Sequence, residues 1–376
     1  MNTLIQLRHH LHQHPELSGR EAGTAEHIAS FIDLHAPPHA LLRNVGGHGV
    51  LAIYEGQQPG PTVLLRCDMD AVPIHELSQL HYRSQAHGVA HSCGHDGHMA
   101  IVAGVALRLA QSPPQRGRAM LLFQPAEETG QGAAQVAAYL EAHPHLRPSY
   151  AIGLHNLPQM PLGQVFLRQG TFAAASKGLI INLKGKNSHA AHPERGLNPS
   201  AATAELMQQL LMLPQRDGYK YFTLCTIVHV RVGEVAFGTS AGEAVLMATL
   251  RAFSDADMQL LDRRAHAEAQ QIALRHGLGL EVSTVEEFPA TVNAPELVLL
   301  AEQACQQQGL NVAHLPQPNR WSEDFAHYAR LCPSLLFGLG AGEQQPELHT
   351  PEYDFPDALI AHGVTAMEAI ARRITG

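Results

Sequence analysis

The chain has few aromatic residues, no long apolar run and fewer basic than acidic residues. Phe, Trp and Tyr make up 5% of its 376 residues, so it lacks the stacking surfaces that bind single-stranded nucleic acids. Lys and Arg number 25 against 34 Asp and Glu, for a net charge of −9. This charge repels phosphate groups, and no basic patch stands out. We therefore expect neither nucleic acids nor anionic membranes as partners.

Segments that span membranes or direct secretion are also missing. No stretch approaches the roughly 18 consecutive apolar residues of a membrane helix. At the amino terminus, Leu4, Leu7 and Leu11 recur at helical spacing among polar residues, without the apolar core of a signal peptide. The five cysteines are scattered and odd in number, which does not indicate a disulfide framework. We expect a cytoplasmic, reduced protein.

The composition and the order of elements predict an α/β enzyme. Hydrophobic residues make up 45% of the chain, with 32 Gly and 24 Pro. Since a typical domain has roughly 150 residues, the length of the chain predicts two domains. Two helices open the chain; Pro15 ends the first, and Ser18 and Glu21 have the spacing of a capping box. Strands and helices then alternate, which is typical of an α/β sheet. The strands are expected at 50–54, 62–66, 119–124, 150–154 and 164–167, with helices after 96 and 131.

A second pattern interrupts the first. Elements are expected in the order strand 179–184, helix 198–213, strand 221–230, strand 244–252, helix 255–276 and strand 280–285. This β-α-β-β-α-β order predicts a compact, ferredoxin-like inserted domain. Helices at 295–308, 321–331 and 357–374 and a strand at 334–339 then return to the first sheet. The expected domains are thus 1–175 and 288–376, together catalytic, and 176–287, an inserted lid.

The run HSCGHDGH, at residues 91–98, is the strongest sign of chemistry. The thiolate of Cys93 and the imidazole of His95, one glycine apart, can reach the same divalent ion. Single residues of either type are more often buried core residues. The neighbouring Asp70 and Asp96 favour the metal interpretation, because ligand histidines usually donate their other ring nitrogen to a carboxylate. His98 is expected to face the following helix.

A pair of carboxylates and two distant histidines complete the candidate site. Glu127 and Glu128 follow a predicted strand, so one can bind metal while the other acts as a general base. An isolated Glu-Glu pair is usually a solvated loop, but its context here favours function. His155 also lies at a strand end, and His349 lies in a turn-rich loop. Because open α/β sheets bind ligands beyond the carboxyl ends of their strands, we expect Glu127, Glu128 and His155 to meet there with Asp68. A histidine in a loop such as that of His349 is by default a surface residue, and the alternative is a metal ligand that arrives from the far end of the chain.

Several sequence strings carry a family resemblance. They are LRCDMDAVP, HSCGHDGHMA, FQPAEETGQGA, GLHNLPQMPLG, NSHAAHPERGLNP, SEDF and LHTPEYDF, with HQHPELS near the start. In order and nearly end to end, they resemble the dinuclear-metal amidohydrolase and peptidase family that contains hippurate hydrolases, N-acyl-amino-acid amidohydrolases and indole-acetyl-amino-acid hydrolases. The resemblance implies a metal-bearing α/β domain interrupted by a lid that pairs two subunits in a homodimer.

The resemblance also implies roles for individual residues. Cys93 resembles the bridging thiolate, and Glu127 resembles the general base. Asp70 resembles a carboxylate that supports a ligand, and Asp68 stands where other relatives carry a ligand histidine. The remaining metal ligands are implied to be His95, Glu128, His155 and His349.

Two residues of the inserted domain are implied to meet the substrate. His189 resembles the histidine that polarises the scissile carbonyl, and such a donor is worth ~3–4 kcal/mol in the transition state. Arg251 resembles a position that meets a substrate carboxylate, although an ordinary strand arginine is an equal alternative. Relatives often read Asn-Val-Ile-Pro where this chain has Gly238–Ala241, so one amide contact is expected to be missing.

The hypothesis is a metal-dependent amidohydrolase that cleaves N-acyl or N-aroyl amino acids with metal-activated water. It uses two divalent ions per subunit; thiolate and imidazole suit Zn²⁺, and the carboxylates also admit Mn²⁺, Co²⁺ or Ni²⁺. One alternative is a dipeptidase or aminoacylase of the same family. Another is a binding protein that keeps metal and ligand but has lost catalysis, against which Glu127 and His189 argue.

Overall fold

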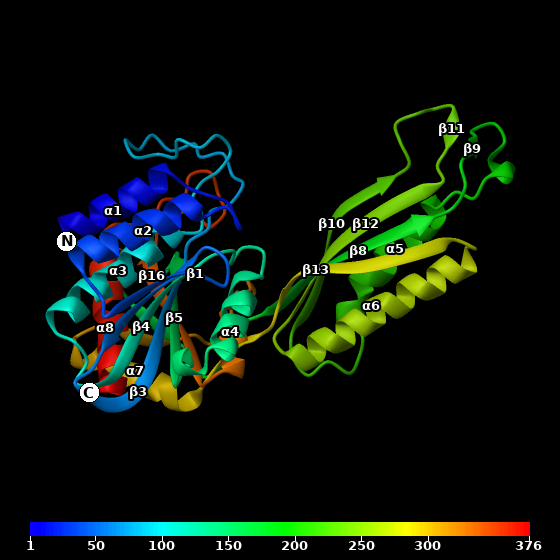
Figure 1. Cartoon of the computed structure of the whole chain (residues 1–376). Coiled ribbons are helices and arrows are strands. Elements are labelled where there is room, and N and C mark those ends of the chain that lie inside the picture. Colours follow the sequence, from blue (N-terminus) through cyan, green and yellow to red (C-terminus); the bar gives the residue numbers. More distant parts are fainter. The chain divides into compact units, whose positions relative to one another are not determined.

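The computed structural model describes residues 1–376 and divides them into two compact units (Figure 1). The first unit comprises residues 1–172, 291–318 and 323–376. The second unit comprises residues 173–290 and the short segment 319–322. The sequence predicts boundaries at 175 and 287 but gives no sign that residues 319–322 return to the second unit.

The first unit is built on a mixed sheet of eight strands, which confirms the α/β prediction. In spatial order they are β1 (Ala40–Val45), β2 (Gly49–Glu55), β4 (Arg116–Gln124), β3 (Gln58–Asp68), β5 (Tyr150–Pro158), β16 (Ser334–Gly342), β6 (Val165–Leu167) and β15 (Val312–His314). The neighbouring strands β4, β3, β5 and β16 are parallel to one another. Their carboxyl ends therefore lie along one edge of the sheet, where open α/β sheets bind ligands.

Helices cover both faces of this sheet. One face packs against α1 (Asn2–Gln13), α2 (Ala22–His35), α3 (His95–Gln111), α7 (Pro295–Gln307) and α8 (Leu359–Thr375) in one hydrophobic core. Along β3, Val63 and Leu65 enter that core, so Leu64 and Arg66 point to the opposite face by strand alternation. Burying each such aliphatic side chain contributes about 1.5–3 kcal/mol. The 3₁₀ helix η4 (Asp324–Arg330) contacts β5, β16 and α4 (Gly132–Ala142).

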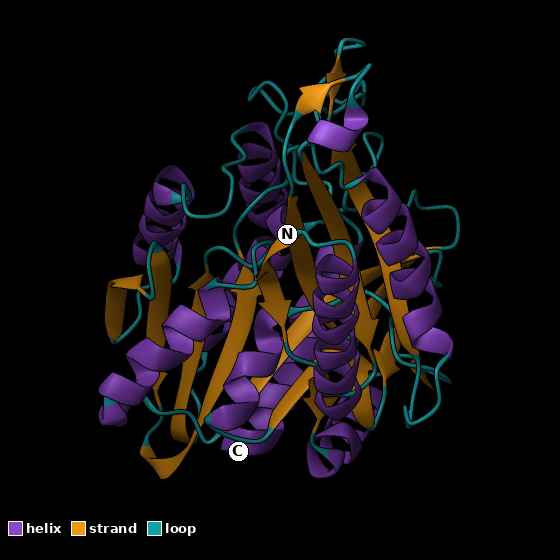
Figure 2. Cartoon of the chain, turned by 90° about the vertical axis from the view of Figure 1, so that its right-hand side faces the viewer, coloured by secondary structure: helices purple, strands orange, loops and turns teal.

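The second unit has the predicted β-α-β-β-α-β order. Its elements are β8 (Ala175–Lys184), α5 (Ser200–Met212), β10 (Thr223–Val232), β12 (Glu243–Ala252), α6 (Asp255–Arg275) and β13 (Gly279–Phe288). The strands form an antiparallel sheet in the order β10-β12-β8-β13. Both helices lie on the same side of this sheet (Figure 1), and alternate residues of β8 and β12 pack under them. The helices and strands of both units can be followed by colour in Figure 2.

Smaller elements complete the chain. They are the strands β7 (Gly170–Ala173), β9 (Ser188–His189), β11 (Thr239–Ser240) and β14 (Thr291–Asn293), with the 3₁₀ helices η1 (Pro144–Leu146), η2 (Pro193–Arg195) and η3 (Leu213–Gln215). No helix of the structure is both long and apolar enough to cross a membrane.

Two local predictions are wrong. The helix expected at 321–331 is the shorter 3₁₀ helix η4, and the bond that the Glu323 carboxylate accepts from the Phe325 amide sets its start. The capping box is also absent. The α2 helix begins at Ala22, while Ser18 donates to the Asp70 carboxylate and Glu21 accepts from the Ala126 amide. Both side chains serve the sheet edge described next instead of capping the helix.

Candidate metal centre

Four neighbouring parallel strands bring the predicted ligands to one edge of the first sheet. Asp68 ends β3, and His155 lies near the end of β5. Glu127 and Glu128 follow β4, and His349 lies in the loop after β16. Because β4, β3, β5 and β16 are adjacent and parallel, residues distant in sequence become neighbours in space.

The loop before α3 places Cys93 and His95 at the same edge. Gly94 separates them with a φ of 94°, in the left-handed region that favours glycine. A Cβ atom at Gly94 would also lie 2.9 Å from the Asn156 side chain. The glycine therefore lets both side chains turn toward the sheet edge. His95 then begins α3, and its Nδ1 lies 2.8 Å from the Asp70 carbonyl oxygen.

The structure brings all five predicted metal ligands and Glu127 together. Within each of three groups, one ligand atom per residue lies within 4.8 Å of the others. The groups are Cys93, His95 and His155; Cys93, Glu128 and His349; and His95, Glu127 and Glu128. Cys93 belongs to two groups, as a thiolate shared between two ions would.

Contacts between these side chains support this convergence. The Cys93 Sγ lies 3.6 Å from His155 Nε2. The Oε1 of Glu128 lies 3.3 Å from His349 Nε2 and 3.8 Å from His95 Nε2. Because the Asp70 carbonyl engages Nδ1 of His95, the Nε2 atom is free to face the centre. That Nε2 atom is buried without any hydrogen bond, which is costly unless another partner, such as a cation, satisfies it.

The charges around the centre favour a cation. Burial lowers the pKa of His95, but the negative charges of Asp68 and Cys93 outweigh burial and raise that pKa well above its usual value. Interactions with Cys93 and Glu128 raise the pKa of His349 to about 10. By contrast, burial and the neighbouring His98 lower the pKa of His155 to about 3, which leaves a neutral imidazole able to bind metal. Thiolate, imidazole and carboxylate donors together fit borderline divalent ions.

Glu127 has the environment of a proton-transfer group. Its side chain is buried, and its pKa is raised well above the usual value by burial and then by the charges of Glu323 and Glu128. A carboxylate with a raised pKa can accept a proton near neutral pH and return it. Carboxylate oxygens of Glu127, Glu323 and Asp324 also lie within 4.8 Å of one another.

Three carboxylates brace the loop that carries Glu127 and Glu128 and the start of the helix α4 that follows it. Glu21 accepts a 2.7 Å bond from the Ala126 amide, where φ is 53°. Asp70 accepts a 2.9 Å bond from the Glu128 amide, and Asp324 accepts a 2.8 Å bond from the Ala133 amide. Asp70 therefore supports two of the predicted ligands, Glu128 through its carboxylate and His95 through its carbonyl. A left-handed alanine costs roughly 1–2 kcal/mol, so its presence here marks a loop held by its surroundings.

His98 is a residue whose role the sequence interpretation missed. It does not face the following helix: its Nδ1 lies 2.7 Å from Asp68 Oδ1, and its Nε2 bonds to the Asn156 side chain. Asp68, His95 and His98 form a further group within 4.8 Å. Since both nitrogens of His98 have partners, we interpret it as a support for the ligands. The i, i+3 spacing with His95 at the start of a helix is the signal that places both on one face.

One further expectation changes around this centre. Asp96 does not support a ligand: it turns away to His12 Nδ1, at 2.8 Å, and to the guanidinium of Arg8.

Arg66, a charged residue inside the apolar strand β3, is fully buried and pairs with Asp68, Glu323 and Asp324 at 2.7–3.0 Å. The sequence analysis did not identify this network. A single charged residue within an apolar strand is the sequence signal that could have indicated it.

His189 and Arg251 both lie in the second unit. His189 is exposed on β9, and its Nδ1 accepts a 3.0 Å bond from the Ala191 amide, so in the neutral ring Nε2 carries the proton. The segment Gly238–Ala241, which departs from the relatives, contains β11, and its Thr239 pairs with His189. Arg251 donates to the Arg320 carbonyl and the Ser322 hydroxyl, at 2.9 and 3.0 Å, and has no acidic partner.

Comparison with known proteins identifies the family. The pattern of peptidase family M20/M25/M40 matches residues 64–373. The chain belongs to this family. Two N-acetylcysteine deacetylases of Bacillus subtilis are each 30% identical to it, over 95% and 99% of this chain and 93% and 88% of their own lengths. The family resemblance read from the sequence is therefore confirmed, and the chain is a hydrolase that acts on linear amides.

A solved structure shows the same fold. The Bacillus subtilis YXEP protein, described as a dinuclear metal binding peptidase of the M20 family, superposes with a TM-score of 0.82. The two chains are 27% identical, and the match covers 100% of this chain and 98% of the other. The predicted cofactor, two divalent ions of undetermined identity, agrees with that relative and with the ligand groups of this centre.

Proposed function

We propose that this protein is a metal-dependent amidohydrolase that hydrolyses N-acyl or N-aroyl amino acids. Cys93, His95, Glu128, His155 and His349 hold two divalent ions, which are Zn²⁺, Mn²⁺, Co²⁺ or Ni²⁺. The observation that carries this proposal is the meeting of those five side chains and Glu127 at the carboxyl ends of four adjacent strands. The deacetylase names of two relatives also favour an N-acyl amino acid as the substrate.

The residues of the centre have separate roles in the proposed reaction. When bound, the ions supply Lewis acidity, which polarises the amide carbonyl and makes water a stronger acid. Glu127 takes a proton from the attacking water and delivers it to the nitrogen of the leaving amine. Its burial and its acidic neighbours, which raise its pKa, suit it to both transfers. Asp70, Glu21 and Asp324 keep the loop of Glu127 in place.

Two residues of the second unit are proposed to bind the substrate. The Nε2–H of His189 donates to the oxygen that becomes negative in the tetrahedral intermediate, since its Nδ1 is already an acceptor. Arg251 binds the carboxylate of the amino-acid portion. Its side chain is fixed by two neutral acceptors and carries an unpaired positive charge, which favours this role over that of an ordinary strand arginine.

We also propose that the second unit is a lid that pairs two copies of the chain through the edge strand β10. The two edges of its sheet differ. The β13 edge carries Glu281, Glu286 and Glu287, and charge of this kind blocks edge pairing. The β10 edge instead has an exposed Val228, and the following segment exposes Phe237 completely.

We propose a cytoplasmic location for the protein. All five cysteines are free and buried, which supports this proposal.

Replacing the proposed base tests the chemistry. We expect Glu127→Gln to keep the metal content, measured by elemental analysis, and to lower kcat by about 10²–10⁴-fold, because the amide cannot take a proton. Glu141→Gln, on the exposed face of α4, is the matched control and should leave both unchanged. Retained activity in Glu127→Gln would remove Glu127 from the mechanism.

A substrate panel tests the specificity. Metal-loaded protein should cleave N-acetyl and N-benzoyl amino acids faster than dipeptides with a free amino group. The opposite preference would favour a dipeptidase or aminoacylase. Binding of these amides without cleavage of any would show a receptor that has lost catalysis.

The pairing of subunits has its own test. We expect Phe237→Asp to convert the dimer to a monomer in analytical ultracentrifugation, since it places a charge beside the proposed pairing edge. Val285→Asp on the β13 edge, where Val285 is 43% exposed, is the control and should remain dimeric. A Phe237→Asp variant that stays dimeric would place the interface elsewhere.

A further inference from the structure

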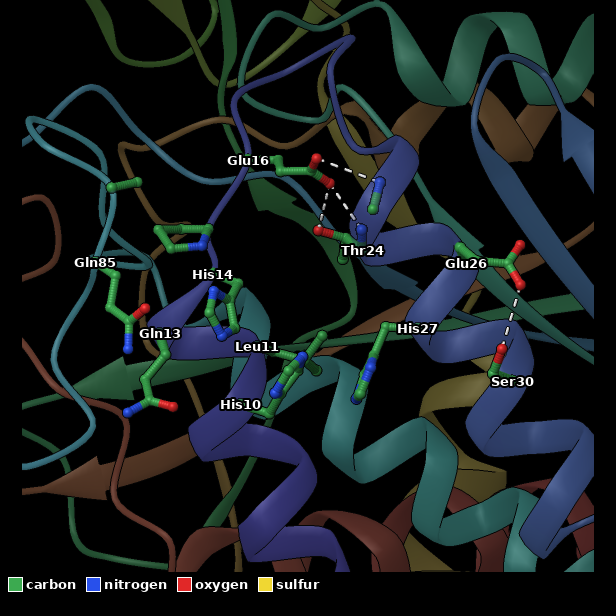
Figure 3. A pocket seen from close by; sticks show the side chains of 13 residues that line it. His10, Leu11, Gln13, His14, Glu16, Thr24, Glu26, His27, Ser30 and Gln85 are labelled. Carbon is green, nitrogen blue, oxygen red and sulfur yellow. Dashed lines mark hydrogen bonds between the residues drawn. The ribbon is translucent and has the colours of Figure 1, made fainter.

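A second cluster of histidines lies away from the metal centre, in a cavity of about 840 Å³ between α1 and α2. His10 comes from the last turn of α1, His14 follows that helix, and His27 comes from α2. Figure 3 shows the three side chains on the wall of this cavity. The residues of the catalytic proposal do not line it.

The three imidazole rings are close together. The ring centres of His10 and His27 are 3.9 Å apart with an angle of 19° between the rings. The ring centres of His10 and His14 are 4.6 Å apart. His14 lies four residues after His10 and is the residue that caps the end of α1, with a non-helical φ of −123°. The helices α1 and α2, with the residue that caps α1, therefore place three imidazoles on the wall of one open space.

Nothing in the protein occupies the ring nitrogens of these three residues. Their side chains take part in no hydrogen bond or ion pair, unlike those of the nearby His9 and His12, which contact Asp357 and Asp96. The two carboxylates of the cavity are committed elsewhere. Glu16 accepts from the amide and hydroxyl of Thr24 at the start of α2, and Glu26 binds Ser30 and Arg43. The available donors are thus imidazoles only.

We propose that His10, His14 and His27 form a binding site for one further divalent transition-metal ion, such as Zn²⁺, which joins α1 to α2. Imidazole donors suit Zn²⁺, Cu²⁺ and Ni²⁺, whereas Mg²⁺ and Ca²⁺ require oxygen ligands. The rings now face one another, so each must turn its edge to an ion at about 2.0–2.1 Å. His10 and His14 are exposed and His27 is half-buried, so this rotation meets little resistance.

The protonation state of the rings is compatible with metal binding. Burial, then the neighbouring His27 and His14, lower the pKa of His10, and burial, then His14, lower the pKa of His27. A lowered pKa favours the neutral form of these two rings, which is the form that binds metal. An ion there would also fix both ends of the segment that carries Ser18 and Glu21, whose side chains reach Asp70 and Ala126.

Counting zinc ions tests this proposal in the whole protein. Metal-loaded protein is dialysed against micromolar Zn²⁺, and bound zinc is measured by elemental analysis. We expect the wild-type chain to bind one ion more than the His27→Gln variant and one more than a His10→Gln/His14→Gln variant. His35→Gln, on the exposed part of the same helix α2, is the control and should bind as many ions as the wild type.

A residue-resolved measurement separates this site from the catalytic one. Diethyl pyrocarbonate should modify His10, His14 and His27 without added Zn²⁺ and should modify them much less with it. Amidase activity should be equal in the wild type and the His27→Gln variant at catalytic metal saturation. Equal zinc counts in the wild type and His27→Gln, or unchanged modification of the three histidines with Zn²⁺, would overturn the proposal.

Discussion

The metal centre and the histidine cavity both gather imidazoles, but they hold them in different ways. At the centre the second nitrogen of each buried histidine is engaged: Asp70 holds His95, the Asn156 carbonyl holds His155 at 2.9 Å, and Asp68 holds His98. In the cavity the rings of His10 and His27 only stack on each other. One group is fixed before any ligand arrives, and the other is free to turn.

The difference concerns what each site must do. A catalytic centre has to hold its ligands within a small fraction of an ångström, because misplacement lowers the rate steeply. A site that only joins two helices can accept the cost of ordering its side chains when the ion binds. The buried salt bridges of Arg66 serve the same purpose, because they fix the strand ends and loops that carry the predicted ligands.

Removing the centre of that network should have the largest effect. Arg66→Met leaves the buried carboxylates of Asp68, Glu323 and Asp324 without their cation, and breaking such a pair costs about 3–5 kcal/mol of unfolding free energy. Urea denaturation measures this loss. Arg43→Met is the matched control: its partners Glu26 and Asp33 are exposed, so it should cost less than about 1 kcal/mol. Equal losses for both variants would mean that the buried network does not hold the fold.

Removing a support of the ligands should have a smaller and more specific effect. His98→Ala frees the Asp68 and Asn156 side chains, and loss of such a support weakens metal binding by about 10–100-fold. Competition with a chelator measures the affinity. His98→Asn keeps a donor near the Nδ1 position and should recover part of it. An unchanged affinity in His98→Ala would mean that His98 only fills space.

Much of the centre could be predicted from the sequence because its signals are local. The strands that end in Asp68, Gln124 and Pro158 are apolar runs followed by polar residues, and their parallel order explains why separated ligands meet. The strands and helices of the second unit were predicted within a few residues, because their apolar periodicity is regular.

The supports of the centre could not be predicted in the same way. Ser18 and Glu21 match a capping box, and nothing local shows that tertiary bonds to Asp70 and the Ala126 amide compete with that use. The same holds for Asp324, which contacts Gln124, Arg66 and the Ala133 amide from a far part of the chain. Such long-range hydrogen bonds have no periodicity, so only the folded structure reveals them.

Histidines of α1 and α2 should respond to pH in two opposite directions. Burial lowers the pKa of His12, but Asp96 outweighs it and raises that pKa to about 9. The stabilisation from His12 is therefore complete below its unfolded pKa, about 6.5, and is lost as the pH rises through 9. His10 and His27 have lowered pKa values instead. The unfolded chain then binds protons more readily, so stability is lost as the pH falls below about 6.5.

The smallest expected effect concerns the loss of stability at acidic pH. Urea denaturation of the wild type from pH 7 to pH 5 should show a decrease in unfolding free energy that the His10→Gln/His27→Gln variant shows less, by roughly 0.3–1 kcal/mol, since both rings are partly exposed. His12→Gln should instead flatten the decrease between pH 7 and pH 9. An identical acid decrease in the wild type and the double variant would mean that stacking does not disfavour protonation. The open cavity would then hold imidazolium as easily as imidazole, and neutral rings would no longer favour metal binding there.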